Sequence, residues 1–66
     1  MAEPDVVPAL VALGFSLNES RAYAALLLAR RGERGIRPRI LDLMDTAGRE
    51  DFHALALAME ALDALA

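Results

Sequence analysis

The sequence predicts an all-α fold, a compact bundle of about four short helices in one helical domain covering residues 1–66. Apolar residues recur at helical spacing along most of the chain, and no segment shows the period of two that a half-buried strand requires. Glycines and helix-capping residues divide these apolar stretches into four segments, at about residues 5–13, 17–31, 38–47 and 49–65. The chain has no cysteine, so a domain of this size must be stabilised by helix packing or self-association.

The first two helices have recognisable start and stop residues. Asp5 suits the N-cap of the first helix, and Gly14 suits the left-handed position that follows its end. Ser16 opens an S-x-x-E capping box and marks the start of the second helix. Every residue from 22 to 29 is apolar or tyrosine, so we expect this helix at the centre of the domain, with Tyr23 in the core. Its alanines should let neighbouring helices approach closely.

The third helix is predicted to be an ordinary amphipathic surface helix. Pro38 is tolerated in its first turn. Its apolar residues recur at i, i+3, i+4 and i+7, namely Ile40, Leu43, Met44 and Ala47. Arg39, Asp42 and Asp45 are left facing water. The preceding segment, residues 32–35, is expected to be a loop.

The fourth helix carries two apolar rows, which is more than one packed face requires. One row is Phe52, Leu55, Met59, Leu62 and Ala66, and the other is Ala54, Ala58, Ala61 and Leu65. One row can pack on the domain, and the other needs a partner or stays exposed. We therefore expect a homodimer through the last helix, with an interface formed by Phe52, Leu55, Met59, Leu62 and Leu65. The alternative is that the domain itself covers both rows.

The charges are unevenly distributed. The formal net charge of −3 argues against a chain that coats nucleic acid through its overall charge. Five of the seven arginines nevertheless lie between residues 30 and 39, against the single acid Glu33, and the chain has no lysine. Because guanidinium groups bind phosphates and carboxylates in bidentate fashion, we expect DNA or an acidic protein to be bound there. The expected site consists of Arg30, Arg31, Arg34, Arg37 and Arg39. The structural alternative is that Arg30 and Arg31 cap the C-terminal end of the second helix and the other three arginines solvate a loop.

Catalytic and metal sites are not expected. Glu50 and His53 have the E-x-x-H spacing of some helical metal sites, but a metal needs three or four ligands and the chain has no second histidine. The sequence contains no phosphate-binding glycine loop and no nucleophile motif. We therefore expect no enzymatic activity, no cofactor and no small-molecule substrate. The longest charge-free run, residues 6–18, is too short to cross a membrane, and we expect a cytoplasmic protein without membrane contact.

The stretch from Leu10 to Leu27, LVALGFSLNESRAYAALL, resembles the opening of TrmB-type winged helix-turn-helix regulators over residues 10–32. These begin with a leucine, a second leucine, glycine, a hydrophobe and Ser or Thr, followed by Glu-Ala-Arg/Lys, Tyr and Ala-Leu-Leu at this spacing. The same turn is similar to those of the RuvA C-terminal and ubiquitin-associated three-helix modules. The resemblance to the regulators implies a DNA-binding helix pair at residues 40–47 and from Glu50 onward, joined at Gly48. The second helix of that pair departs from the pattern, because it offers Arg49, His53, acids and apolar residues rather than base-reading side chains.

Three functions are compatible with these features. The first is a small non-catalytic transcription regulator with helix-turn-helix-like character, which contacts DNA or an acidic partner through residues 30–39. The second is a helical protein–protein interaction or dimerisation module that does not bind nucleic acid. The third is a structural or engineered helical bundle without a partner.

Overall fold

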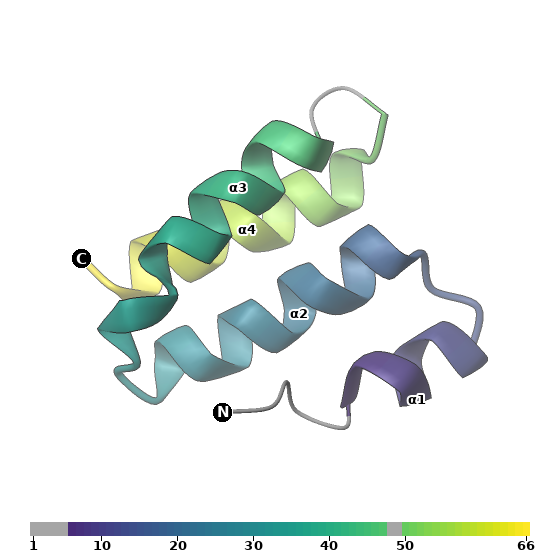
Figure 1. Cartoon of the computed structure of the whole chain (residues 1–66), viewed down its shortest axis with the longest axis horizontal. Coiled ribbons are helices and arrows are strands. Elements are labelled where there is room, and N and C mark those ends of the chain that lie inside the picture. Colours follow the sequence, from purple (N-terminus) through teal and green to yellow (C-terminus); the bar gives the residue numbers. More distant parts are fainter. Residues whose placement is uncertain (1–5, 48–49) are drawn as a thin grey trace.

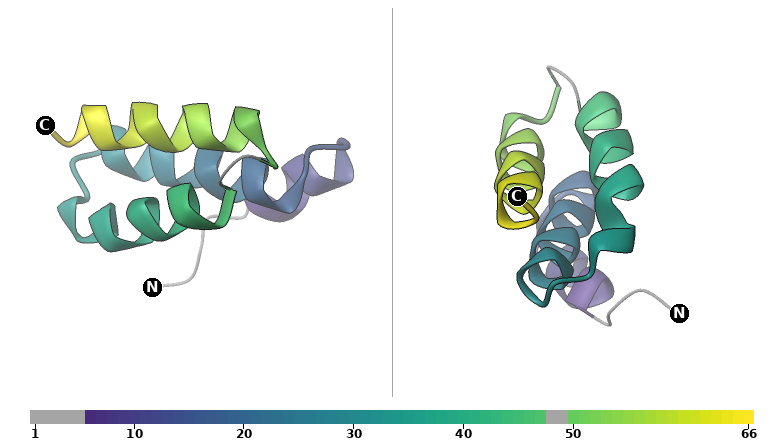
Figure 2. Two further views of the ribbon diagram at one scale, coloured as in Figure 1. Left: turned by 90° about the horizontal axis from the view of Figure 1, so that it is seen from above. Right: turned by 90° about the vertical axis from the view of Figure 1, so that its left-hand side faces the viewer.

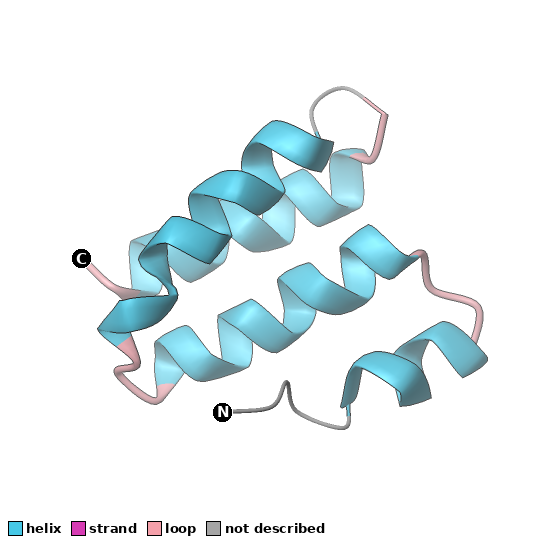
Figure 3. Ribbon diagram, viewed as in Figure 1, coloured by secondary structure: helices cyan, strands magenta, loops and turns pink. Residues whose placement is uncertain are grey.

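The computed structural model describes residues 6–47 and 50–66, and within these ranges the chain is helical, with no strand (Figures 1 and 3). The elements in chain order are α1 (Val6–Ala12), α2 (Leu17–Arg30), the 3-10 turn η1 (Arg34–Ile36), α3 (Arg37–Ala47) and α4 (Phe52–Ala64). The predicted all-α bundle is therefore confirmed. The predicted helix ends agree to within one residue, except at the start of the last helix.

Helices α2, α3 and α4 run antiparallel to one another in succession and form a three-helix bundle, seen from its end in Figure 2. The α2–α4 contact is the most extensive between any two elements, and α2 also touches α1, η1 and α3. This arrangement confirms the central position predicted for α2. Helix α1 packs against α2 and against no other helix.

Capping side chains and left-handed glycines define the helix ends. Gly14 has φ +105° after α1, and Gly32 has φ +86° after α2, so both adopt the conformation that glycine accommodates at a helix end. The Glu19 amide donates to Ser16 Oγ at 3.0 Å, which confirms Ser16 as the α2 N-cap. The Ala54 amide donates in the same way to Asp51 Oδ1 at 3.1 Å.

Asp51 is therefore the N-cap of α4, whereas the sequence placed it inside the first turn of a helix starting at residue 49. Capping requires the Asp51 backbone to lie outside the helix while its carboxylate reaches the Ala54 amide. Glu50 precedes this N-cap and therefore also lies before the helix. The predicted N-cap Asp5 and the predicted separator Gly48 lie outside the described residues.

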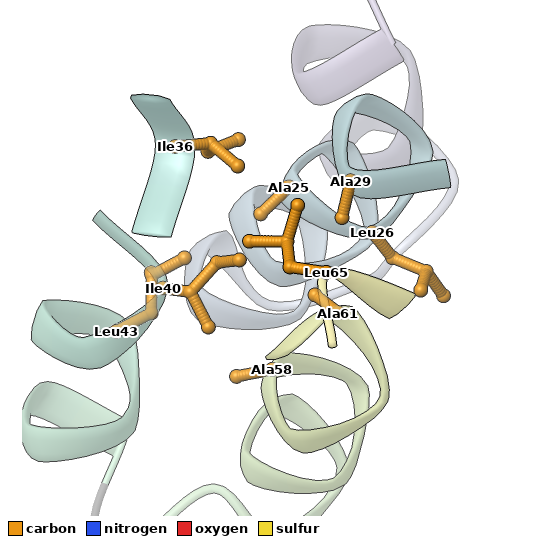
Figure 4. Packing of buried hydrophobic residues seen from close by; sticks show 9 residues of the cluster. All are labelled: Ala25, Leu26, Ala29, Ile36, Ile40, Leu43, Ala58, Ala61 and Leu65. Atoms are coloured by element: carbon orange, nitrogen blue, oxygen red, sulfur yellow. The ribbon is translucent and has the colours of Figure 1, made fainter. Parts of the chain in front are cut away.

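The core lies where α2, α3 and α4 meet (Figure 4). Alanines form much of it: Ala22, Ala25 and Ala29 of α2 and Ala54, Ala58 and Ala61 of α4 are all almost inaccessible to solvent. Small side chains allow two helix backbones to pack closely, as the alanine content predicted. Larger residues fill the side toward α3, where Ile40 has 0% of its surface exposed.

Three expectations about the core are corrected. Leu65, assigned by the sequence to the partner interface, is only 5% exposed and packs in the cluster with Ile36 and Ile40 (Figure 4). Tyr23, which was expected in the core, has 39% of its surface exposed. The expected loop before α3 contains the η1 turn, whose Ile36 is buried against the bundle.

Candidate interaction surfaces

The apolar row of α4 that contains Phe52, Leu55, Met59 and Leu62 is the most conspicuous exposed feature of the described residues. The alanine row, Ala54, Ala58 and Ala61, is turned into the core, which leaves the other row on the outer side of the helix. Phe52 is 76% exposed and Met59 is 54% exposed, while Leu55 and Leu62 are half-buried. Isolated exposed apolar residues are common on protein surfaces, but a row at helical spacing is typical of a contact surface.

This row borders a groove between α3 and α4. The groove has a volume of about 360 Å³, and Met44 of α3 faces Met59 and Leu62 of α4 across it. The other residues that line it are Arg37, Asp63 and Ala66, at the end where α3 begins and α4 finishes. Methionine side chains adapt readily to the shape of a partner, so an apolar groove that contains two of them suits a protein ligand.

The outer side of α3 adds a residue that the sequence analysis missed. Leu41 is 47% exposed and lies between Arg37 and Met44 in the i, i+4, i+7 row that borders the groove. The apolar row predicted for this helix contains Ile40, Leu43, Met44 and Ala47 but not Leu41. An apolar residue outside the buried row of a helix is expected to be exposed, and this signal could have identified Leu41 as a surface residue.

The starts of α2 and α4 meet at the opposite end of α4. Ser16 Oγ donates a hydrogen bond of 2.6 Å to Asp51 Oδ2, so the two N-cap side chains are joined to each other. Phe15 and Leu17 flank Ser16 and Phe52 follows Asp51, and all three of these side chains are exposed. Exposed apolar side chains thus also occur where the starts of α2 and α4 meet.

The five arginines predicted as an anion site all lie around the corner formed by the end of α2, η1 and the start of α3 (Figure 1). Each of them is exposed. Arg30 is the last residue of α2 and Arg31 is its C-cap, where a positive charge favourably meets the negative end of the helix dipole. Arg34 Nη1 donates to the Leu65 carbonyl at 3.2 Å and so satisfies an acceptor at the end of α4. Arg30 and Arg31 thus lie at the end of α2, as the structural alternative expected, whereas the contact of Arg34 with the end of α4 was not part of that alternative.

Arg37 and Arg39 lie at the opposite kind of helix end. Both lie in the first turn of α3, where the positive end of the helix dipole disfavours cations by about 0.3–1 kcal/mol each. That turn contains no acidic residue, and the last turn of α3 contains no basic one. The charges of α3 are therefore arranged against its own dipole, with Asp45 near the negative end. Such an order does not stabilise the isolated helix.

Helices α3 and α4, which the resemblance would make the DNA-binding pair, lie antiparallel along each other (Figures 1 and 2). The two helices of a DNA-binding helix-turn-helix cross instead at about 90–120°. The exposed side of α4 presents apolar residues, and its first turn presents His53. This geometry favours α4 as a packing helix, as its composition indicated.

The metal-site spacing in α4 gathers no further ligands. Within residues 6–47 and 50–66 there is no group of three or more histidine, cysteine, aspartate or glutamate residues that could hold a metal ion. His53 is exposed on the helix surface. No helix in the described part of the chain is both long and apolar enough to cross a membrane.

The chain matches no protein-family model, and neither a curated protein nor a solved structure is detectably similar to it. Functional inference therefore depends on the surfaces described above.

Proposed function

We propose that this protein is a non-catalytic helical interaction module that binds another protein chain through the outer side of α3 and α4. The observation that carries the proposal is the exposed apolar row of α4, in which Phe52 and Met59 have more than half of their surfaces in water. Apolar and methionine-rich surfaces of this kind gain free energy when a partner removes them from water.

The packing of the domain supports the proposal because Phe52 and Met59 lie outside the core clusters, whereas Leu55 and Leu62 of the same row pack against them. The contact between α2 and α4 is made by the alanine row and Leu65, which are already buried. Phe52 and Met59 therefore contribute little to the stability of the monomer. Residues that are large, apolar and dispensable for folding are typical of an interface centre.

Site-specific photocrosslinking tests this proposal. A benzophenone amino acid in place of Met59 should give covalent adducts with protein in cells that produce the chain, because this position would lie inside the interface. The matched control places the same amino acid at Glu60, which is exposed on another side of α4. Adducts of equal yield from both positions, or from neither, would contradict the proposal. The mass of the adduct separates a second copy of the chain from a different protein.

A second candidate function is contact with DNA or an acidic protein through Arg30, Arg31, Arg34, Arg37 and Arg39. It is favoured by the concentration of these five exposed side chains at one corner of a chain whose net charge is −3. The two in the first turn of α3 are placed against the helix dipole, so the dipole does not account for their positions. In this form the protein would be a small regulator that reaches phosphates from the α2–α3 corner rather than from α4.

Salt-dependent binding tests the second candidate. Replacing Arg31 with Gln should weaken binding to a labelled DNA duplex and reduce the slope of log affinity against log salt by about 1, because one phosphate contact is lost. Arg21→Gln is the matched control, since Arg21 is exposed on α2 but lies outside the corner. Fluorescence anisotropy at two salt concentrations measures both variants, and a parallel titration with polyglutamate identifies an acidic protein partner. Equal behaviour of the two variants would exclude this function for the arginine corner.

A further inference from the structure

The outer side of α3 carries a self-complementary stripe. Arg37, Leu41 and Asp45 follow one another at i, i+4 and i+8, and all three are exposed. The stripe thus has a cation at one end, an apolar residue in the middle and an anion at the other end. The two charges are each four residues from Leu41, which corresponds to about 6 Å along the helix axis.

Such a stripe matches a copy of itself that runs in the opposite direction. If two α3 helices cross antiparallel at Leu41, the Arg37 end of each helix lies over the Asp45 end of the other. Residues at i±4 spacing form one of the surface ridges through which helices commonly pack, so the three residues can meet a second helix together. A two-fold axis forms both ion pairs at once, because each contact in such an interface occurs twice.

The apolar groove lies beside this crossing. Arg37 and Met44, which precede and follow Leu41 in the row, both line the groove, and Met59 and Leu62 line it from α4. A second copy centred on Leu41 would therefore cover the methionine side chains of the groove as well as the stripe. Charge complementarity fixes the direction of the second copy, and the groove supplies apolar area for it to bury.

We propose that two copies of this chain form a symmetric dimer through α3, antiparallel about an axis between their Leu41 side chains, with Arg37 of each copy paired to Asp45 of the other. This inference rests on the proposed interaction surface and specifies its occupant. It also accounts for the positions of Arg37 and Asp45 on α3. Charges that oppose the dipole of their own helix become favourable when each meets an opposite charge on the second copy.

Charge reversal in mixed samples tests the arrangement. Arg37→Asp and Asp45→Arg should each weaken self-association roughly tenfold or more, since each puts two like-charged pairs across the interface. An equimolar mixture of the two variants should restore the dimer as a heterodimer, because every pair is then again of opposite sign. Sedimentation velocity measures the mass of the associating species in four samples: each variant alone, their mixture and the wild type. Asp42→Arg is the matched control, as Asp42 is exposed on α3 but lies off the stripe, and it should associate like the wild type.

Loss of folding cannot imitate this pattern. Arg37→Asp puts an acid at the start of α3 and Asp45→Arg puts a base in its last turn, so both changes suit the helix dipole and should leave the monomer at least as stable. A wild-type chain that stays monomeric at millimolar concentration would overturn the dimer. Failure of the mixture to associate would overturn the proposed pairing of Arg37 with Asp45. The same holds if Arg37→Asp regained dimer formation when mixed with Asp63→Arg instead of Asp45→Arg. The interaction surface itself would still stand if the Met59 position crosslinked to a different protein.

Discussion

Replacing Ile40 with Ala should lower the free energy of unfolding by about 3–5 kcal/mol. Ile40 is 0% exposed and packs where α3 meets α2 and α4 (Figure 4), so its removal loses buried apolar area and leaves a cavity. A domain of 66 residues has a total stability of roughly 3–10 kcal/mol. The expected loss is therefore a large fraction of the total stability. Urea denaturation followed by far-ultraviolet circular dichroism, at fixed protein concentration, measures the change.

Ile40→Val is the graded control for this prediction. It removes one methylene from the same site and should cost about 0.5–1.5 kcal/mol. A loss from Ile40→Ala no larger than that from Ile40→Val would show that the α3 side of the core is loosely packed.

Replacing Ala58 with Leu should destabilise the protein by about 1–3 kcal/mol or more, although it adds apolar volume. Ala58 is 0% exposed, in a cluster that includes Ala25, Ala61 and Leu43. Extra side-chain volume at a closely packed helix contact forces the backbones apart or strains rotamers. The change should appear as a lower midpoint of urea or thermal denaturation.

The control for Ala58→Leu is the same substitution at Ala56, which is exposed on α4. Alanine and leucine have similar helix propensities, so Ala56→Leu should leave the midpoint almost unchanged. If both variants unfolded at the same midpoint, the contact between α2 and α4 would not depend on small side chains.

The sequence predicted the helices well because their boundaries are determined by local chemistry. Gly14, Ser16 and Gly32 act through their own backbone or through a side chain that reaches a nearby amide, so their roles can be recognised without knowledge of the tertiary fold. The central place of α2 followed from its unbroken apolar surface. The start of α4 was predicted three residues early, because an acidic residue near a helix start favours both an N-cap and a first-turn position.

The surfaces were less predictable, because tertiary packing determines which of two rows faces inward. Both rows of α4 are apolar, and the sequence offered no reason for Leu65 to be buried while Met59 is exposed. The close α2–α4 contact selects the alanine row, and Leu65 follows it as the next residue on that side. The role of Arg34 at the end of α4 depends on a contact across 31 positions of the chain, which no local pattern contains.

We expect α1, which packs against α2 but against neither α3 nor α4, to lie outside the most stable part of the protein. Val7 is the one buried residue of α1, and α2 is its one helical neighbour. Segments with few buried contacts open at a lower free energy than the whole protein unfolds. Helix α1 should therefore detach and reattach while α2, α3 and α4 stay folded. Each opening uncovers the side of α2 on which α1 lies, so the protein has a transient apolar surface in addition to its permanent one.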